Sequence, residues 1–190
     1  MIERLILSAA LAVALGAGFA GAASAAVVTD QQNLPAGAGL NIHTDFMHWQ
    51  QEVLVGVSGE LAGLDLFYEH AQPQDSMTCV YRGEGWHDNG ALAQWVVAAV
   101  NGTIHLDLSA WNLAFSAGET LVLGFTGSGP LSLCCALKGN GGAYGAGKLW
   151  SWNVEQDGID VGFVTYMDNG KGTVPEPASL GLLGLGLAGL

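Results

Sequence analysis

The middle of the chain, from about residue 50 to residue 167, is a series of short apolar and alternating runs separated by glycine-rich turns. In the clearest run, Leu61 to Tyr68, every second residue from Leu64 onward is a large apolar side chain, and Asp65 and Phe67 fall on the other face. The other expected strands are Gln51 to Val57, Met77 to Tyr81, Ala93 to Val100, Thr103 to Leu108, Thr120 to Phe125, Leu131 to Leu137, Lys148 to Val154 and Ile159 to Met167. This pattern predicts an all-β fold, an antiparallel β-sandwich or jelly roll.

The residues between the runs predict the connections. Asn101 and Gly102 separate two expected strands by two residues, which is a strong signal for a type I′ β-hairpin. The small and polar residues from Ala26 to about Leu40 predict a flexible segment that leads into the domain. Residues 109–113 fit either a short strand or an irregular crossover, and the sequence does not decide between them.

The N-terminal segment has the three parts of a secretory signal peptide. Arg4 gives a charged start, Leu5 to Phe19 is apolar, and Ala23-Ser24-Ala25 resembles a signal peptidase cleavage site. We therefore expect residues 1–25 to be a signal peptide, the alternative being an uncleaved N-terminal membrane helix.

The C-terminal segment begins with Val174, Pro175, Glu176 and Pro177 and continues with 13 uncharged Leu, Gly, Ala and Ser residues to Leu190. Both prolines fix φ and bias the residues before them to extended backbone, so no helix continues through them. As a helix the apolar run spans roughly 20 Å, shorter than the ~30 Å core of a bilayer. We expect a short apolar sorting helix that associates only transiently with a membrane. A buried C-terminal helix of the domain is the alternative.

This tail resembles the PEP-CTERM sorting signal of exported bacterial proteins. The resemblance implies that an exosortase processes the protein and that it reaches the envelope, outer surface or extracellular matrix of a Gram-negative bacterium that makes exopolysaccharide. Signals of this family usually carry further apolar residues and a short Arg-rich end, which are not present here. That difference leaves open a truncated sequence or a degenerate signal.

The two ends leave residues 26–173, about 148 residues, which suits a single domain with its own core. This domain contains four basic residues and fifteen Asp and Glu residues. Nucleic acid and anionic lipid surfaces attract clustered Lys and Arg, so we expect no nucleic-acid partner.

Three cysteines lie in a chain expected to reach a compartment that permits disulfides. Cys134 and Cys135 point to opposite faces if they lie on a strand. We expect one disulfide, from Cys79 to Cys134 or Cys135, and the alternative is three free thiols. No Cys-x-x-Cys or paired-His spacing accompanies them, so we expect no zinc site.

The sequence contains no catalytic motif that we identify, neither Gly-x-Ser-x-Gly nor a P-loop nor a dinucleotide-binding glycine pattern. We therefore expect no catalytic, cofactor-binding or metal-binding residues and no enzyme activity. His43 and His48 are five residues apart, a spacing that matches neither one face of a helix nor one face of a strand. Asp157 and Asp160 could bind Ca²⁺ together with backbone carbonyls, although a pair of turn acids is the simpler interpretation.

Six tryptophans are many for such a domain: Trp49, Trp86, Trp95, Trp111, Trp150 and Trp152. Aromatic faces stack on the apolar C–H surface of sugar rings, so an exposed subset is typical of a sugar-binding surface. Trp86 lies among loop residues, and Trp150 and Trp152 would share one face of the strand expected there. These three are the tentative ligand-contacting residues, and a core role is the alternative for each.

The order of several motifs resembles the carbohydrate-binding-like β-sandwich ectodomains of exported bacterial proteins with sorting tails. The motifs are Gly59 to Leu66, Ala117 to Gly124, Ala143 to Trp150 and Gly158 to Tyr166. The leading hypothesis is therefore a non-catalytic surface or matrix protein that contacts exopolysaccharide. The alternatives are a secreted hydrolase that acts on polysaccharide and a self-associating structural matrix protein.

Overall fold

A computed structural model describes residues 26–35, 41–43, 48–69, 75–98, 100–127, 136–141 and 144–170. Val27–Asn169 form one compact unit, and the second unit, 1–26 with 170–190, lies almost wholly outside the described residues. The predicted signal peptide and sorting tail, and Cys134 and Cys135, also lie outside them. The predicted boundaries at residues 25 and 173 stay predictions.

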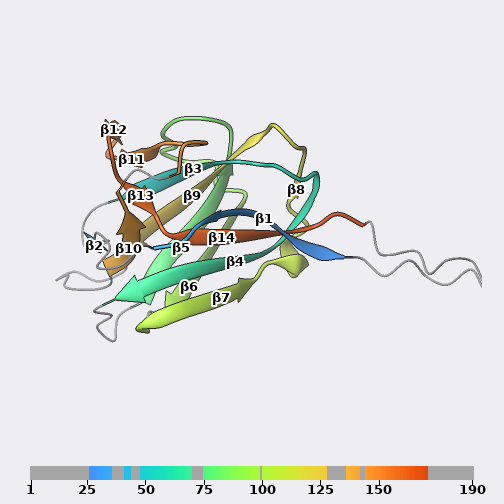
Figure 1. Ribbon diagram of the computed structural model, residues 1–190, viewed down its shortest axis with the longest axis horizontal. Coiled ribbons are helices and arrows are strands. Elements are labelled where there is room, and N and C mark those ends of the chain that lie inside the picture. Colours follow the sequence, from blue (N-terminus) through green and yellow to red (C-terminus); the bar gives the residue numbers. More distant parts are fainter. Residues whose placement is uncertain are drawn as a thin grey trace, which may run out of the picture. The chain divides into compact units, whose positions relative to one another are not determined.

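The described strands form two antiparallel sheets (Figure 1). The eight-stranded sheet has the order β1 (Val27–Asn33), β14 (Phe163–Asp168), β4 (Gly59–Glu69), β10 (Ala136–Asn140), β13 (Asp160–Val161), with β2 (Asn41–His43) on β10 and β7 (Gly102–Asp107) and β8 (Ala114–Phe115) on β4. The six-stranded sheet has the order β12 (Val154–Gln156), β11 (Leu149–Ser151), β3 (Trp49–Leu54), β9 (Thr120–Gly127), β5 (Asp75–Arg82), β6 (Ala93–Ala98). The predicted all-β, antiparallel two-sheet fold is confirmed.

The helical content of the described residues is one 3₁₀ turn, η1 (Ser109–Trp111), at the segment that the sequence left undecided. Among the same residues, no helix has the length and apolar character needed to cross a membrane.

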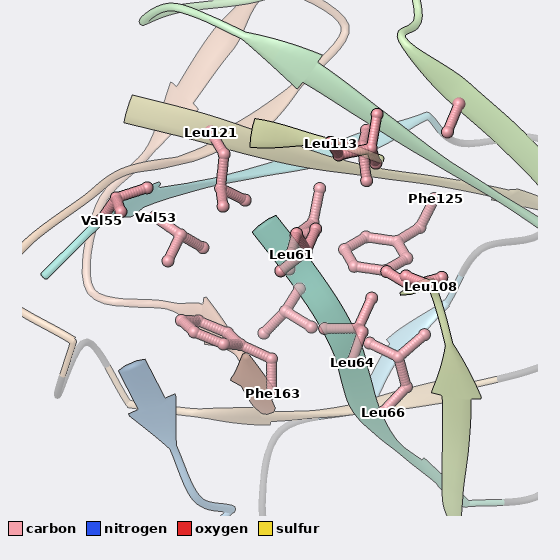
Figure 2. Packing of buried hydrophobic residues seen from close by; sticks show 14 of the residues in the cluster. Val53, Val55, Leu61, Leu64, Leu66, Leu108, Leu113, Leu121, Phe125 and Phe163 are labelled. Atoms are coloured by element: carbon pink, nitrogen blue, oxygen red, sulfur yellow. The ribbon is translucent and has the colours of Figure 1, made fainter. Parts of the chain in front are cut away.

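The apolar residues of the alternating runs meet between the two sheets. Figure 2 shows Leu61, Leu64 and Leu66 of β4 beside Leu121 and Phe125 of β9, with Phe163 of β14 close by. All six are buried. Burial of each such side chain contributes about 1.5–3 kcal/mol before entropic costs, so this layer holds the sheets together.

Within the segment expected to be a flexible lead-in, Val27–Asn33 instead form strand β1, which pairs with β14, while residues 36–40 lie outside the described ones. Its polar side chains make specific hydrogen bonds. Asp30 Oδ1 accepts from the backbone N–H groups of Gly56 and Val57 at 2.9 and 2.6 Å, and buried Asn33 donates to Val161 O at 2.7 Å. The polar composition led to the wrong prediction of a flexible segment, because these side chains are hydrogen-bonded to protein and not to solvent.

The predicted hairpin at Asn101-Gly102 is wrong. The strand before it, β6, pairs with β5 of the six-stranded sheet, whereas the strand after it, β7, pairs with β4 of the other sheet. The two strands approach the same core from opposite sides, with Val97 buried from one sheet and Leu106 packed against the core from the other. Gly102 adopts φ 112°, so the glycine serves a crossover between sheets.

The single strand predicted for residues 148–154 is also wrong. Leu149–Ser151 and Val154–Gln156 form a hairpin, and its turn residues Trp152 and Asn153 adopt φ 49° and 63°. Positive φ at both central positions is the feature of a type I′ turn, for which Trp is an unusual residue. Trp150 and Trp152 therefore do not share a strand face.

The last predicted strand, Ile159 to Met167, is divided at Gly162 into β13 and β14. A Cβ at Gly162 would lie 2.7 Å from Pro35 Cγ and 2.9 Å from Lys138 O. The close approach of β10 and of the segment after β1 thus requires glycine at this position.

Candidate functional site

A cleft of about 690 Å³ lies on the six-stranded sheet, on the face turned away from the core. Aromatic and amide side chains dominate its lining, which is His48, Gln50, Met77, Cys79, Tyr81, Trp86, His87, Asp88, Asn89, Gly90, Ala91, Gln94, Trp152 and Asn153. Strand alternation places Cys79 and Tyr81 here, because their neighbour Val80 faces the core. Volume and composition are in the range of small-molecule sites.

The floor of the cleft depends on a glycine in β9. A Cβ at Gly124 would lie 2.8 Å from Cε2 of Tyr81 and 3.4 Å from Cβ of Cys79. The missing side chain therefore gives the Tyr81 ring its place on the sheet. The ring of His87 stacks on Tyr81 with centroids 5.2 Å apart and planes at 8°.

The segment from Gly83 to Leu92, which joins β5 to β6, supplies one wall of the cleft. Gln50 holds it through both ends of its amide: Nε2 donates to the carbonyl of His87 at 2.7 Å, and the backbone N–H of His87 donates to Oε1 at 2.8 Å. Gln50 is buried, so these two bonds fix the wall against the sheet.

Glu52, two residues further along β3, makes a second attachment. Its buried carboxylate Oε1 accepts from the backbone N–H of Gly85 at 2.6 Å and from Nε1 of Trp150 at 2.9 Å. Trp150 is half-buried and does not line the cleft. The structure therefore gives this tryptophan a supporting position behind the wall, away from the place where the sequence put it beside Trp152.

Trp86 and Trp152, the other two tentative ligand-contacting residues, both line the cleft. Trp86 is half-buried, and its Nε1 donates to Asp88 Oδ1 at 2.7 Å, which fixes the orientation of the indole. Trp152 is 55% exposed at the tip of the β11–β12 hairpin. Its ring meets that of His48 edge to face, with centroids 4.7 Å apart. Residues 66 positions apart thus form one aromatic surface.

The other three tryptophans take different positions. Trp49 is buried in the core, Trp95 packs against it, and Trp111 is 44% exposed beside Trp95 at 5.9 Å. None of the three lines the cleft.

Sequence reasoning missed the polar residues of the site. Gln50 and Glu52 lie in Trp49-Gln50-Gln51-Glu52-Val53, five consecutive buried residues of which three are polar. Buried Gln and Glu are uncommon without a partner, so this run was the available signal that something covers the outer face of β3.

Asp157 and Asp160, the two acids considered for Ca²⁺, lie in different environments. Asp157 is exposed, whereas Asp160 is buried and accepts from Tyr144 N at 3.1 Å and Gln51 Nε2 at 3.3 Å. Burial raises the pKa of Asp160 above its usual value. No group of three or more His, Cys, Asp or Glu residues in the described part of the chain could hold a metal ion, and calcium stays an untested expectation.

Cys79, the described half of the predicted disulfide, is buried at the cleft floor, and burial raises the pKa of its thiol. Its pairing with Cys134 or Cys135 stays a prediction, because both residues lie outside the described ones.

The outer face of the eight-stranded sheet carries a second polar group, which we call the Asp65 cluster: Asp65, His105 and Tyr166. Asp65 Oδ1 lies 2.6 Å from His105 Nδ1, and Tyr166 OH donates to Oδ2 at 2.7 Å. The side chain of His105 is 60% exposed, and no cleft of comparable aromatic lining covers it among the described residues.

Comparison with known proteins identifies the tail. Residues 173–190 match the family model of the PEP-CTERM protein-sorting motif. The chain is therefore an exported protein that carries the motif sorted by exosortase.

No curated protein matches the chain. Among solved structures, the structure of the infectious bursal disease virus Gx strain aligns at 13% identity over 88% of this chain, with a TM-score of 0.16. The chain spans 46% of that viral chain.

Proposed function

We propose that this exported protein is a non-catalytic component of the cell surface or extracellular matrix that binds polysaccharide in the cleft of the six-stranded sheet. The observation that carries the proposal is the convergence of Trp86 and Trp152 on one cleft, from a loop and from a hairpin tip. A ligand that packs on both indoles would remove their apolar surface from water, which favours binding at this cleft.

The chemistry of the lining suits a sugar. Indole faces pack on the apolar C–H face of a pyranose ring, while hydroxyl groups need both donors and acceptors. Amide side chains offer both, and the cleft contains Asn89, Gln94 and Asn153 besides Gln50. Gln50 is already committed to the backbone of His87, so the other three are the groups that would meet sugar hydroxyls.

The lining also favours binding over catalysis. Glycoside hydrolysis generally needs two carboxyl groups, roughly 5–10 Å apart. Asp88 is the single carboxylate among the described lining residues, and its Oδ1 accepts from Trp86. A hydrolase remains the competing hypothesis that the experiment below separates.

The sorting motif gives the setting for the proposal. An exported protein that passes an exosortase meets the polymers of the envelope and matrix, and exopolysaccharide of a Gram-negative bacterium is the ligand source we propose. The apolar run would contact the membrane transiently, while processing takes place.

The test is isothermal titration of the purified protein with the matrix polysaccharide extracted from the producing bacterium. Trp152→Ala should abolish binding and change the free energy of unfolding by less than about 0.5 kcal/mol, because the side chain is largely exposed. Trp111→Ala is the matched control, an exposed tryptophan outside the cleft, and should bind as the wild type does.

Each other outcome has a clear meaning. Binding that survives both Trp86→Ala and Trp152→Ala would place the ligand elsewhere and overturn the proposal. Release of reducing ends that stops on Asp88→Asn would favour the hydrolase.

A further inference from the structure

We infer that the cleft takes an uncharged saccharide and discriminates against acidic ones such as uronates. This inference rests on the proposed function and names the ligand class of the same site. Its basis is the charge of the lining, which contains one Asp and, among the described residues, neither Lys nor Arg.

The basic side chains elsewhere in the described chain are already paired with acids. Arg82 lies 2.9 Å from Glu119 and over the ring of Phe115, Lys138 lies 3.2 Å from Glu69, and Lys148 lies 2.7 Å from Glu155. None of these three lines the cleft. An acidic sugar would therefore find no described Lys or Arg there to replace the water around its carboxylate, and the lining groups that can become cations are the imidazoles of His48 and His87.

Repulsion from negative charge on the protein also disfavours an acidic sugar. The whole chain has a formal net charge of −12, but solvent ions screen distant charges beyond about 8 Å at physiological ionic strength. The charge that matters at short range is Asp88, which lines the cleft itself. Since its Oδ1 accepts from Trp86 Nε1 at 2.7 Å, this carboxylate is held at the wall beside the aromatic surface.

Neutral hydroxyls, in contrast, find suitable partners. In the described part of the chain the side chains of Asn89 and Asn153 make no hydrogen bond with protein, and both line the cleft, one from the Trp86 loop and one from the Trp152 turn. Each amide can donate to one hydroxyl and accept from another. Loop and turn thus each bring an indole and an amide to the lining.

Two oligosaccharides of equal length and different charge test the inference: cellohexaose, which is neutral, and hexagalacturonate, which is acidic. Titrations use the full protein at about pH 8, where imidazole is ordinarily uncharged, and at two salt concentrations. We expect neutral binding at least about ten-fold tighter than uronate binding, with little salt dependence, and its loss in Trp152→Ala.

A second and more direct test adds a cation to the cleft by substitution. Asn89→Lys places an ammonium in the lining without breaking a hydrogen bond of the described structure, and it should raise uronate affinity at least about ten-fold at low salt. Val27→Lys is the matched control: it adds the same charge at an exposed position of β1 outside the cleft and should leave uronate binding unchanged.

The outcomes separate this inference from the proposed function. Uronate binding equal to or tighter than neutral binding, lost in Trp152→Ala, overturns the inference and leaves the polysaccharide site intact. No binding of these probes or of neutral and acidic sugars on a glycan array overturns both.

Discussion

The outer faces of the two sheets share one arrangement, a side-chain ring that lies over a glycine with a carboxylate nearby. The surfaces that result are nevertheless different. On the six-stranded sheet the Tyr81 ring lies over Gly124, and on the eight-stranded sheet the His105 ring lies over Gly63, whose Cβ would be 3.0 Å from His105 Cε1. In both places a carboxylate nearby accepts two hydrogen bonds, Glu52 on the first and Asp65 on the second.

The difference is the covering segment. Residues 83–92 fold over the first face and bury the contacts of Glu52 and Gln50, while in the Asp65 cluster the side chain of Asp65 is 16% exposed and that of His105 is 60% exposed. A hydrogen bond contributes more to stability where water cannot replace it. The buried contacts of Glu52 and Gln50 therefore hold residues 83–92 as a fixed wall of the cleft. We expect mutations on the two faces to differ accordingly.

The largest contrast is between the two carboxylates. Glu52→Ala leaves the Gly85 N–H and Trp150 Nε1–H without their acceptor and should cost about 2–4 kcal/mol in the free energy of unfolding. Asp65→Ala removes two bonds of similar length, but the His105 side chain that it frees is 60% exposed and can bond to water, so the loss should be smaller, about 1 kcal/mol. Urea denaturation measures both.

The control for this pair is Glu52→Gln, which retains an acceptor oxygen and should recover more than half of the loss. Polysaccharide binding should fall with Glu52→Ala and stay unchanged with Asp65→Ala. Equal losses of stability would show that the covering loop does not shield the Glu52 contacts.

A smaller contrast is expected between the two glycines. Gly124→Ala puts a methyl group 2.8 Å from a Tyr81 ring that is stacked under His87, so the ring cannot move without displacing the cleft wall. Overpacking of this kind costs about 1–3 kcal/mol. Gly63→Ala meets an exposed imidazole that can swing into solvent, and should cost about 1 kcal/mol or less. Thermal unfolding compares them, and a costlier Gly63→Ala would contradict the comparison.

The sequence predicted the all-β fold well because the signal is local. In Leu61 to Tyr68 the alternation alone places Leu64, Leu66 and Tyr68 in the core, and they are buried there. Pairing is not local. Asn101-Gly102 had the right turn residues, yet the flanking strands joined different sheets because the core lies between them.

The site was predictable only in part. Trp86 was recognisable from its glycine-rich surroundings, and Trp152 from its aromatic character, but the strand assigned to Trp152 was wrong because turn formation overrode β-propensity at residues 152 and 153. The roles of Gln50, Glu52 and Gly124 depend on a loop that returns from over thirty residues away in sequence or on a neighbouring strand. No pattern along one strand encodes such contacts.

The smallest effect concerns the two tyrosines. Burial, with a contribution from Cys79, raises the pKa of Tyr81 to about 12, while the hydrogen bond to Asp65 raises the pKa of half-buried Tyr166 above 10.0. Both folded pKa values exceed the unfolded one, so each tyrosine contributes stability below about pH 10 that is lost as pH rises through its folded pKa. The free energy of unfolding, measured by urea denaturation at successive alkaline pH values, should fall accordingly.

The single variants assign this alkaline loss to one face or the other. Tyr81→Phe should reduce the loss of stability near pH 12, part of which remains because burial also raises the pKa of Tyr144 to about 12. Tyr166→Phe should remove the part of the loss that comes from the hydrogen bond to Asp65 and leave the loss near pH 12 unchanged. If the two variants change the pH dependence equally, the covering loop does not desolvate Tyr81. The difference between the two faces would then rest only on the contacts of Gly124 and Gly63 and of the carboxylates Glu52 and Asp65.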